Sequence, residues 1–282
     1  MSMANELKVI RSWKVELEEM SGLAVREGDA GLEILAIADN VHHLAVMPIS
    51  QPDAKRLGKP YVKLGKLIGK KGASQWEAVA TDDAGNVFVL EENPGGVIGF
   101  SRELDRVLGR IELDVEDMAL VPGWKTDANS RGEGLLLLAN GHLLLAKEKR
   151  PPMLVEVAPL GVEAQGVTGA ALRPGTFTLD GDVRFAAVAV WSLANDLGDV
   201  SDIAATADGR LFAVSDQSNV LVEIALPLDP ASAVAIVKTR WQLPAEIQKA
   251  EGLVMRADGA PVIGVDCKSS LHDLFLLEPI GE

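Results

Sequence analysis

One pattern of hydrophobic and polar positions recurs along the chain: a short apolar run, a turn rich in Gly, Asp or Asn, and a second apolar run. Residues 251–266, EGLVMRADGAPVIGVD, show it most clearly. Short apolar runs separated by Asp-Gly or Asn-Gly turns, which require positive φ, are typical of β-hairpins. Similar stretches occur at 21–40, 76–93, 133–152 and 201–219. The sequence therefore predicts several copies of one hairpin.

Each hairpin is followed by a third apolar run, and often by a fourth. Four strands in each repeat are typical of a β-propeller blade. The last repeat ends at Glu282 without a fourth strand, whereas residues 6–17, ELKVIRSWKVEL, have no repeat of their own. Pairing these two segments predicts an all-β propeller over residues 1–282. It would be a single domain whose ring is closed by the N-terminal strand, which leaves no exposed sheet edge.

Two blade counts are compatible with these repeats. Five four-stranded blades are favoured, because the intervals between the repeat starts leave little room for a complete extra blade. Six blades are the alternative, since VEDMALVPG at 115–123 resembles another inner strand and the segment 158–200 is long enough to be irregular.

Composition and charge limit the compartment and the partners. The single cysteine, Cys267, cannot form an internal disulfide. The first residues carry charges where a signal peptide requires an apolar stretch, and no apolar run approaches the roughly 18 residues of a membrane helix. We therefore expect a cytoplasmic protein. A formal net charge of −14 argues against nucleic acid or an anionic membrane as a partner.

Acidic residues mark the ends of the hairpin strands. In a propeller blade the start of the innermost strand and the end of the second strand lie on the same face. The inner strands start at Ser21, Glu77, Glu133, Ser201 and Glu251. The second strands end at Asp39, Glu92, Glu148, Asp216 and Asp266. We therefore expect a double ring of acids at one mouth of the central channel, with Asp202 adding a carboxylate beside Ser201.

These carboxylates have two interpretations. Carboxylates that converge on one axis repel each other and raise each other's pKa values, unless a cation, a proton or hydrogen-bond donors compensate. Oxygen ligands of this kind suit a hard cation, Ca²⁺ before Mg²⁺. Alternatively, the side chains accept backbone N–H bonds from the neighbouring blade and are structural.

Basic residues and histidines occur in the segments that should reach the same face. An acidic centre with a basic rim would suit an anionic small molecule, and its candidate contacts are Lys71, Lys147, Lys149 and Arg150. His42 is the candidate general base. Lysine-rich loops and adjacent histidines are also common on solvated surfaces.

The chain resembles the SdiA-regulated family of β-propellers over nearly its whole length. The resemblance rests on SGLAV at 21–25, WEAVA at 76–80, EGLLLL with AKEKRPP in 133–152, DVSDIA with VSDQSNVLVEI in 199–224, and AEGLVM at 250–255. It implies the propeller fold and leaves the biochemistry open.

The starts of the inner strands also look like those of calcium-dependent gluconolactonase and paraoxonase propellers. That resemblance implies Glu77, Glu133, Glu251 and Asp202 as metal ligands on the axis. A small lactone or phosphoester would then be hydrolysed, with His42 activating water. The alternatives are a non-catalytic propeller that binds a ligand or a protein at this mouth, or a structural role.

Overall fold

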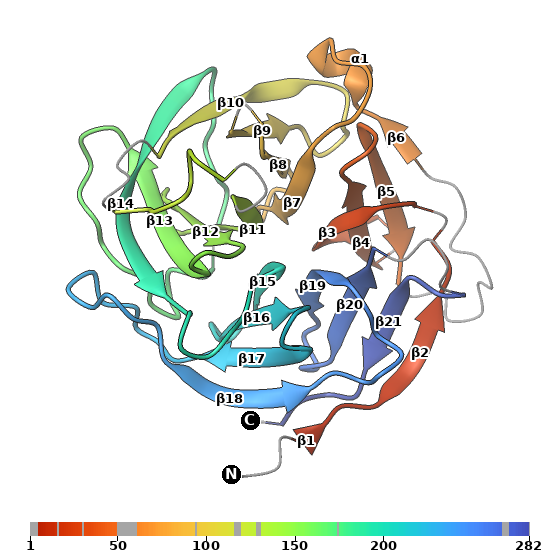
Figure 1. The fold of residues 1–282 in the computed structure, drawn as a ribbon. Helices are drawn as coiled ribbons and strands as arrows, with labels where there is room; N and C mark the ends of the chain where they lie inside the picture. The colour runs from red at the N-terminus through yellow and green to blue at the C-terminus, as the bar shows by residue number, and fades with distance from the viewer. Residues whose placement is uncertain are drawn as a thin grey trace.

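The computed structural model describes residues 5–15, 17–29, 31–49, 61–93, 95–115, 120–127, 131–173, 175–266 and 271–281. In this part of the chain groups of neighbouring β-strands are arranged around a central axis, and the chain runs once around the ring (Figure 1). The prediction of an all-β propeller is confirmed. The described residues form one short helix, α1 (Gly65–Ile68), and none of their helices has the length and apolar character needed to cross a membrane.

Within the described ranges the strands fall into five successive groups of four neighbours. Group 1 contains β3 (Met20–Gly28), β4 (Gly31–Ala38), β5 (His43–Pro48) and β6 (Tyr61–Lys63). Group 2 contains β7 (Trp76–Thr81), β8 (Val87–Glu91), β9 (Gly96–Phe100) and β10 (Val107–Asp114). Group 3 contains β11 (Gly132–Leu137), β12 (Leu143–Lys147), β13 (Met153–Pro159) and β14 (Val183–Ser192).

Group 4 contains β15 (Asp202–Ala205), β16 (Leu211–Ser215), β17 (Val220–Ile224) and β18 (Val237–Gln242). Group 5 contains β19 (Ala250–Met255), β20 (Pro261–Val265), β21 (Leu274–Leu277) and the N-terminal β2 (Val9–Trp13). Residues 116–119, within the stretch that allowed a sixth inner strand, lie outside the described residues. The preferred count of five blades therefore stays a prediction.

The N-terminal segment joins the two ends of the ring, as predicted. β2 pairs antiparallel with β21, and Trp13 lies opposite Leu274. Asp273 accepts a hydrogen bond from the Val15 N–H at 2.6 Å, and its carboxylate lies 3.0 Å from Lys14 Nζ. In addition, β1 (Asn5–Glu6) pairs in parallel with β18. The first strands of the chain therefore hold group 4 as well as group 5.

Groups 2 and 3 are also linked at their outer edges. β10 and β14 pair in parallel, with Ile111 opposite Val183 and Asp114 opposite Ala186. This pairing merges the two groups into one 8-stranded sheet. The sequence repeats do not predict it, because each repeat by itself is a complete antiparallel unit.

Inner strands approach one another closely because a glycine stands at the third position of β11 and of β19, directly after the glutamate. A Cβ atom at Gly252 would lie 2.6 Å from Leu23 Cγ, and one at Gly134 would lie 2.8 Å from Ile203 Cγ1. Since real Cβ contacts are longer than this, a larger residue would push neighbouring groups apart. The Glu-Gly-Leu pattern of the sequence is therefore a packing requirement, and it brings the preceding glutamates toward the axis.

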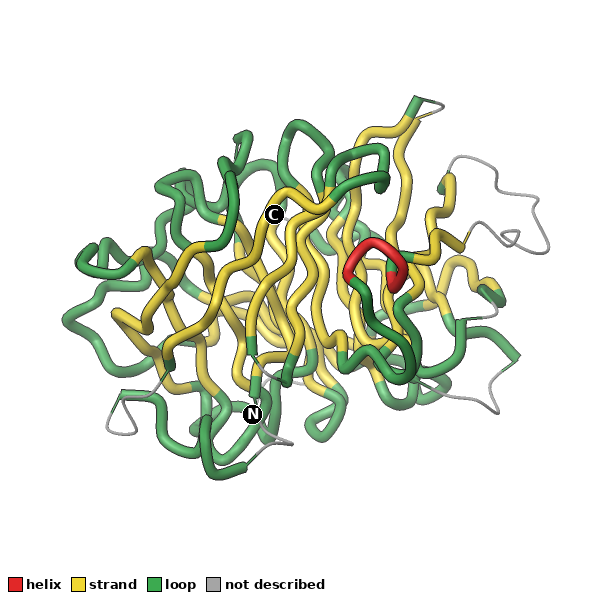
Figure 2. The backbone as a smooth tube through the Cα atoms, turned by 90° about the horizontal axis from the view of Figure 1, so that it is seen from above, coloured by secondary structure: helices red, strands yellow, loops and turns green. Residues whose placement is uncertain are grey.

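Loops gather on the two opposite faces of the ring, and the strands lie between them (Figure 2). Large side chains fill the space between groups. Trp76 and Phe100, for example, pack with Leu35 and Ile37 between groups 1 and 2. Burial of such apolar surface contributes roughly 25 cal/mol per Å².

Deleting residues 1–13 should prevent cooperative folding of the whole ring. The deletion removes β2 from β21 and takes Trp13 out of the core that it shares with Met20 and Val254. We expect loss of a cooperative urea transition, followed by near-UV circular dichroism. Ile10→Thr is the matched control, because the Ile10 side chain on the same strand is 59% exposed. It should change the free energy of unfolding by less than about 0.5 kcal/mol. A truncated protein as stable as the full chain would contradict the assignment of β2 as the closing strand.

Candidate functional site

Three glutamates from different strand groups approach one end of the central channel, and we call them the glutamate mouth. Glu77 is on β7, Glu133 on β11 and Glu251 on β19, each at the second residue of its strand. All three side chains are partly exposed. Their carboxyl groups are nevertheless partly removed from solvent by the surrounding protein, which disfavours a charge there.

Burial and repulsion by neighbouring acids raise the pKa of all three carboxyl groups, and burial is the larger cause at each. The pKa of Glu77 rises to about 8 and that of Glu251 to about 8. The pKa of Glu133 is raised well above its usual range, because Glu77 and Glu251 add to the effect of burial. Near neutral pH the mouth therefore holds protons on its glutamates.

Further acids surround the glutamate mouth and repel its charges. They are Asp39, Glu92, Glu148, Asp199, Asp216 and Asp266. The structure thus brings the predicted inner glutamates and outer acids to one end of the channel. Asp199 is an addition that the strand-end rule missed, because it lies two positions before Ser201 in the DVSD stretch. It accepts hydrogen bonds from the Ser215 hydroxyl and from the Gln217 N–H.

Asp202 is not grouped with the glutamates. Its side chain is 3% exposed, and its carboxylate accepts the N–H groups of Ile203 and Leu253, both at 2.8 Å. The N–H of Leu23 also bonds to it. Burial raises the pKa of Asp202, and these backbone bonds oppose that shift. Asp202 on β15 therefore connects to β19 and β3, which is the structural role that the sequence left as an alternative.

The structure places His42 in a buried site beside Trp76, in the turn between β4 and β5. The imidazole is 6% exposed and meets the Trp76 ring edge to face, with 5.2 Å between centroids. Its main electrostatic neighbours are Glu91 and Lys70, which pair with each other at 2.5 Å. Burial lowers the pKa of His42, which favours the neutral form of the ring. Its role as a general base stays a prediction.

Lys147 is fully buried at the end of β12. Its Nζ donates to the backbone carbonyl oxygens of Lys149 and Pro151, the latter at 3.3 Å. Burial lowers the pKa of Lys147 to about 8. Its ammonium group is thus committed to the turn that follows β12.

The other predicted basic contacts are engaged or lie at the surface. Lys149 Nζ lies 2.5 Å from Glu148 Oε1, and Arg150 Nη1 lies 2.7 Å from Asp127 Oδ2. Lys71 is exposed. The positive charge expected to select an anionic ligand is therefore largely balanced by neighbouring carboxylates.

A hard divalent cation suits the chemistry of the glutamate mouth, since carboxylate oxygens are its preferred ligands. The arrangement does not form a ready site: across the described ranges, no three His, Cys, Asp or Glu side chains are grouped so that they could hold a metal ion. The protons that Glu77 and Glu251 hold near neutral pH also reduce the repulsion among these acids.

The fold defines the chain as a β-propeller with a cluster of acidic side chains at one end of its channel. Family comparison then places it more closely: the SdiA-regulated model matches residues 65–263. The chain belongs to the SdiA-regulated family, as the sequence motifs implied. No curated protein matches it.

Several solved structures share the fold. The PQQ-bound aldose sugar dehydrogenase of Streptomyces coelicolor has a TM-score of 0.53 at 14% identity, covering 97% of this chain and 98% of that chain. A candidate glucose dehydrogenase from Thermus thermophilus has a TM-score of 0.53 at 10% identity, covering 96% and 100%. A structure described as a candidate gluconolactonase has a TM-score of 0.50 at 11% identity, covering 99% and 93%. At these identities the likeness shows the propeller fold alone.

The stability of the protein should fall as the pH rises through neutrality. The folded-state pKa of Glu77 and Glu251 is about 8, against 4.5 for the ordinary group. Their contribution to stability is therefore fully present below about pH 4.5 and is lost as the pH rises through about 8.

Glu77→Gln imitates the protonated form and should increase the free energy of unfolding at about pH 9 by roughly 1–2 kcal/mol. Urea midpoints between about pH 5 and 9 measure this change. Glu103→Gln, at an exposed position, should leave the pH profile unaltered, and a Glu77→Gln profile identical to it would contradict the raised pKa.

Replacing Asp202 by Ala should destabilise the ring by about 2–4 kcal/mol, because the buried N–H groups of Ile203 and Leu253 would lose their acceptor. Asp202→Asn retains one carbonyl oxygen and should lose less. Thermal or urea unfolding of both variants tests this order, with Glu103→Ala as a surface control. Equal stability of Asp202→Ala and wild type would show that the carboxylate is not a structural acceptor.

Proposed function

We propose that this protein is a hydrolase of a small lactone and that the glutamate mouth is its catalytic centre. The proposal rests on one observation: three carboxyl groups with pKa values shifted toward or above neutrality share one mouth of the channel. A phosphoester is the less favourable substrate, because the basic side chains are paired and the surrounding acids repel a phosphate.

The shifted pKa values suit proton transfer at neutral pH. General acid–base catalysis works best when the pKa of the group lies near the operating pH. Protonated Glu133 can donate its proton to the leaving oxygen of the lactone. The ionised fraction of Glu77 or Glu251 can accept a proton from the attacking water.

The hydrolytic step balances within this cluster. The water oxygen bonds to the carbonyl carbon, and the ring C–O bond breaks. One proton passes from water to Glu77 or Glu251, and one passes from Glu133 to the alkoxide. Because the carboxylates repel each other, ionisation of one favours protonation of its neighbours, which returns the proton to Glu133.

A divalent cation, Ca²⁺ before Mg²⁺, is proposed as a ligand that competes with these protons. Glu77, Glu133 and Glu251 would hold it after their side chains close around one point, and it would polarise a substrate oxygen. Asp202, the predicted fourth ligand, is held in place by hydrogen bonds from the backbone N–H groups of Ile203 and Leu253.

A binding role without catalysis is the second candidate. It is favoured by the position of His42, the predicted general base. The main electrostatic neighbours of this imidazole are Glu91 and Lys70, and not the glutamates of the mouth. Protonated carboxyl groups can hold a polar ligand through hydrogen bonds without activating water. The two candidates differ in whether the bound molecule is turned over.

Glu133→Gln should lower kcat/KM for lactone hydrolysis by at least about 100-fold, because the amide cannot donate a proton to the leaving oxygen. A pH-stat assay with γ-butyrolactone, δ-gluconolactone and a phosphomonoester provides the measurement, and Glu103→Gln is the matched control. Hydrolysis that survives in Glu133→Gln would overturn the proposed centre. Lactone binding without turnover by the wild type would overturn catalysis in favour of the second candidate.

Titration with CaCl₂ in the same preparations tests the cation. The wild type should release protons on binding and unfold at a higher temperature, whereas Glu133→Gln should show a smaller response. Identical responses of the two proteins would exclude Glu133 as a ligand.

A further inference from the structure

The central channel contains a cavity of roughly 300 Å³ that is separate from the glutamate mouth. An apolar ring marks its boundary, and each of the five inner strands contributes one residue to the ring, two positions after its glutamate or serine. The members are Leu23, Val79, Leu135, Ile203 and Leu253. They are 1–4% exposed. The cavity extends from this ring toward the opposite face, and none of the three glutamates lines it.

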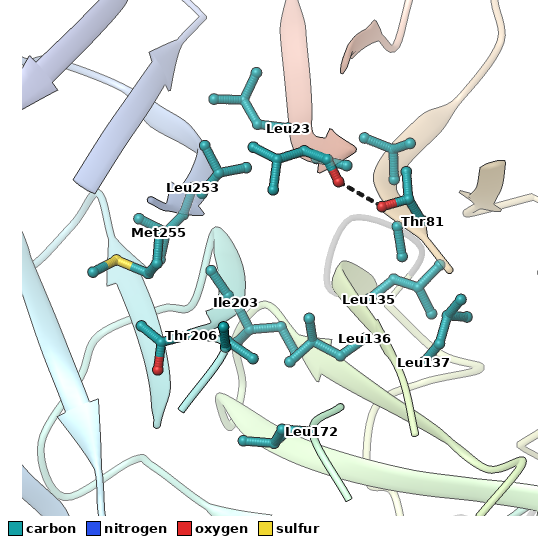
Figure 3. Close-up of a pocket in the computed structure, with 18 of the residues that line it drawn as sticks. Leu23, Thr81, Leu135, Leu136, Leu137, Leu172, Ile203, Thr206, Leu253 and Met255 are labelled. Atoms are coloured by element: carbon teal, nitrogen blue, oxygen red, sulfur yellow. Dashed lines mark hydrogen bonds between the residues drawn. The ribbon is translucent and has the colours of Figure 1, made fainter. Parts of the chain in front are cut away.

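The side chains that line the cavity are mainly apolar (Figure 3). Leu, Val, Ile, Ala and Met side chains from all five inner strands line it, and Leu172 adds to the rim from the segment between β13 and β14. The two wall hydroxyl groups are already used: Thr81 donates to the Val25 carbonyl at 2.6 Å, and Thr206 accepts the Arg210 N–H at 3.0 Å. Such walls offer few side-chain partners to water, which favours an apolar occupant.

The charged residues that line the cavity do not favour a charged ligand of either sign. Its charged lining residues in the described ranges are Asp83 and Arg173, which have opposite signs and are both exposed. Arg173 donates to the Asp208 carbonyl at 3.0 Å. The inner edges of the strands, however, turn backbone N–H and C=O groups toward the channel, because no further strand pairs with them. One neutral hydrogen-bonding group on a ligand would therefore find a partner.

We propose that this half of the channel is a second ligand site, for a small uncharged molecule with an apolar body and one neutral hydrogen-bonding group. A volume of roughly 300 Å³ is at the lower end of the range of small-molecule sites. The molecule enters from the face opposite the glutamate mouth. This site is independent of the proposed hydrolysis, because the apolar ring separates the two.

The neutral probe N-phenyl-1-naphthylamine, which has two aromatic units and one N–H group, tests the proposal by its fluorescence. The wild type should bind it saturably at one site per chain. Ala204→Leu and Ala80→Leu each narrow the cavity from a different strand and should weaken binding by at least about 10-fold, since overfilled sites exclude the ligand. Glu133→Gln, at the other end of the channel, should bind the probe as the wild type does.

The absence of saturable binding to the wild type would overturn the proposal, as would equal binding by a narrowed variant that retains cooperative unfolding. Binding weakened by Glu133→Gln would overturn it too, because the probe would then occupy the glutamate mouth. Crystals of the wild type soaked with the probe locate it directly and do not depend on the folding of the variants. Lactone hydrolysis is measured at the opposite mouth, so failure here leaves the proposed function to its own test.

Discussion

The unpaired inner edge of the innermost strands is the constraint on which this ring depends. Its N–H groups need acceptors, and Asp202 supplies one to β19 and β3 as well as to its own strand. The strands can meet there only because Gly134 and Gly252 carry no side chain. The same close approach brings the preceding glutamates together. Stability and chemistry at the axis therefore have one geometric origin.

Repulsion at the mouth and apolar closure behind it divide the channel into two environments. On one side, burial and the charges of Glu77 and Glu251 raise the pKa of Glu133, so its carboxyl group favours the protonated form. On the other side, Leu135 and Ile203 belong to the apolar ring at the boundary of the cavity. Two positions along an inner strand separate Glu133 from Leu135. A step of roughly 7 Å along the strand is therefore sufficient to produce that change.

The fold could be predicted from the sequence because the signals for its hairpins are local. Asp-Gly turns, apolar runs and the Glu-Gly-Leu starts each act over a few residues, and the missing last strand identified the N-terminal segment as its replacement. The features that could not be predicted depend on packing between segments that are distant in the sequence. The parallel pairing of β10 with β14, the partner of Arg150 at Asp127, and the burial of His42 against Trp76 all follow from loop paths. Asp202 could be assigned to either of two roles until its acceptor geometry was known.

The closing strand has a consequence for synthesis of the chain. Val15 and Asp273, which are hydrogen-bonded across the seam, are 258 positions apart. A ribosome therefore releases β2 long before its partner β21 exists. Contacts of such long separation form slowly, since loop closure precedes any gain from pairing. During translation β2 is without its final partner until β21 has been made. Arg11 and Ser12 in this strand, and Lys14 directly after it, reduce its tendency to aggregate in that period.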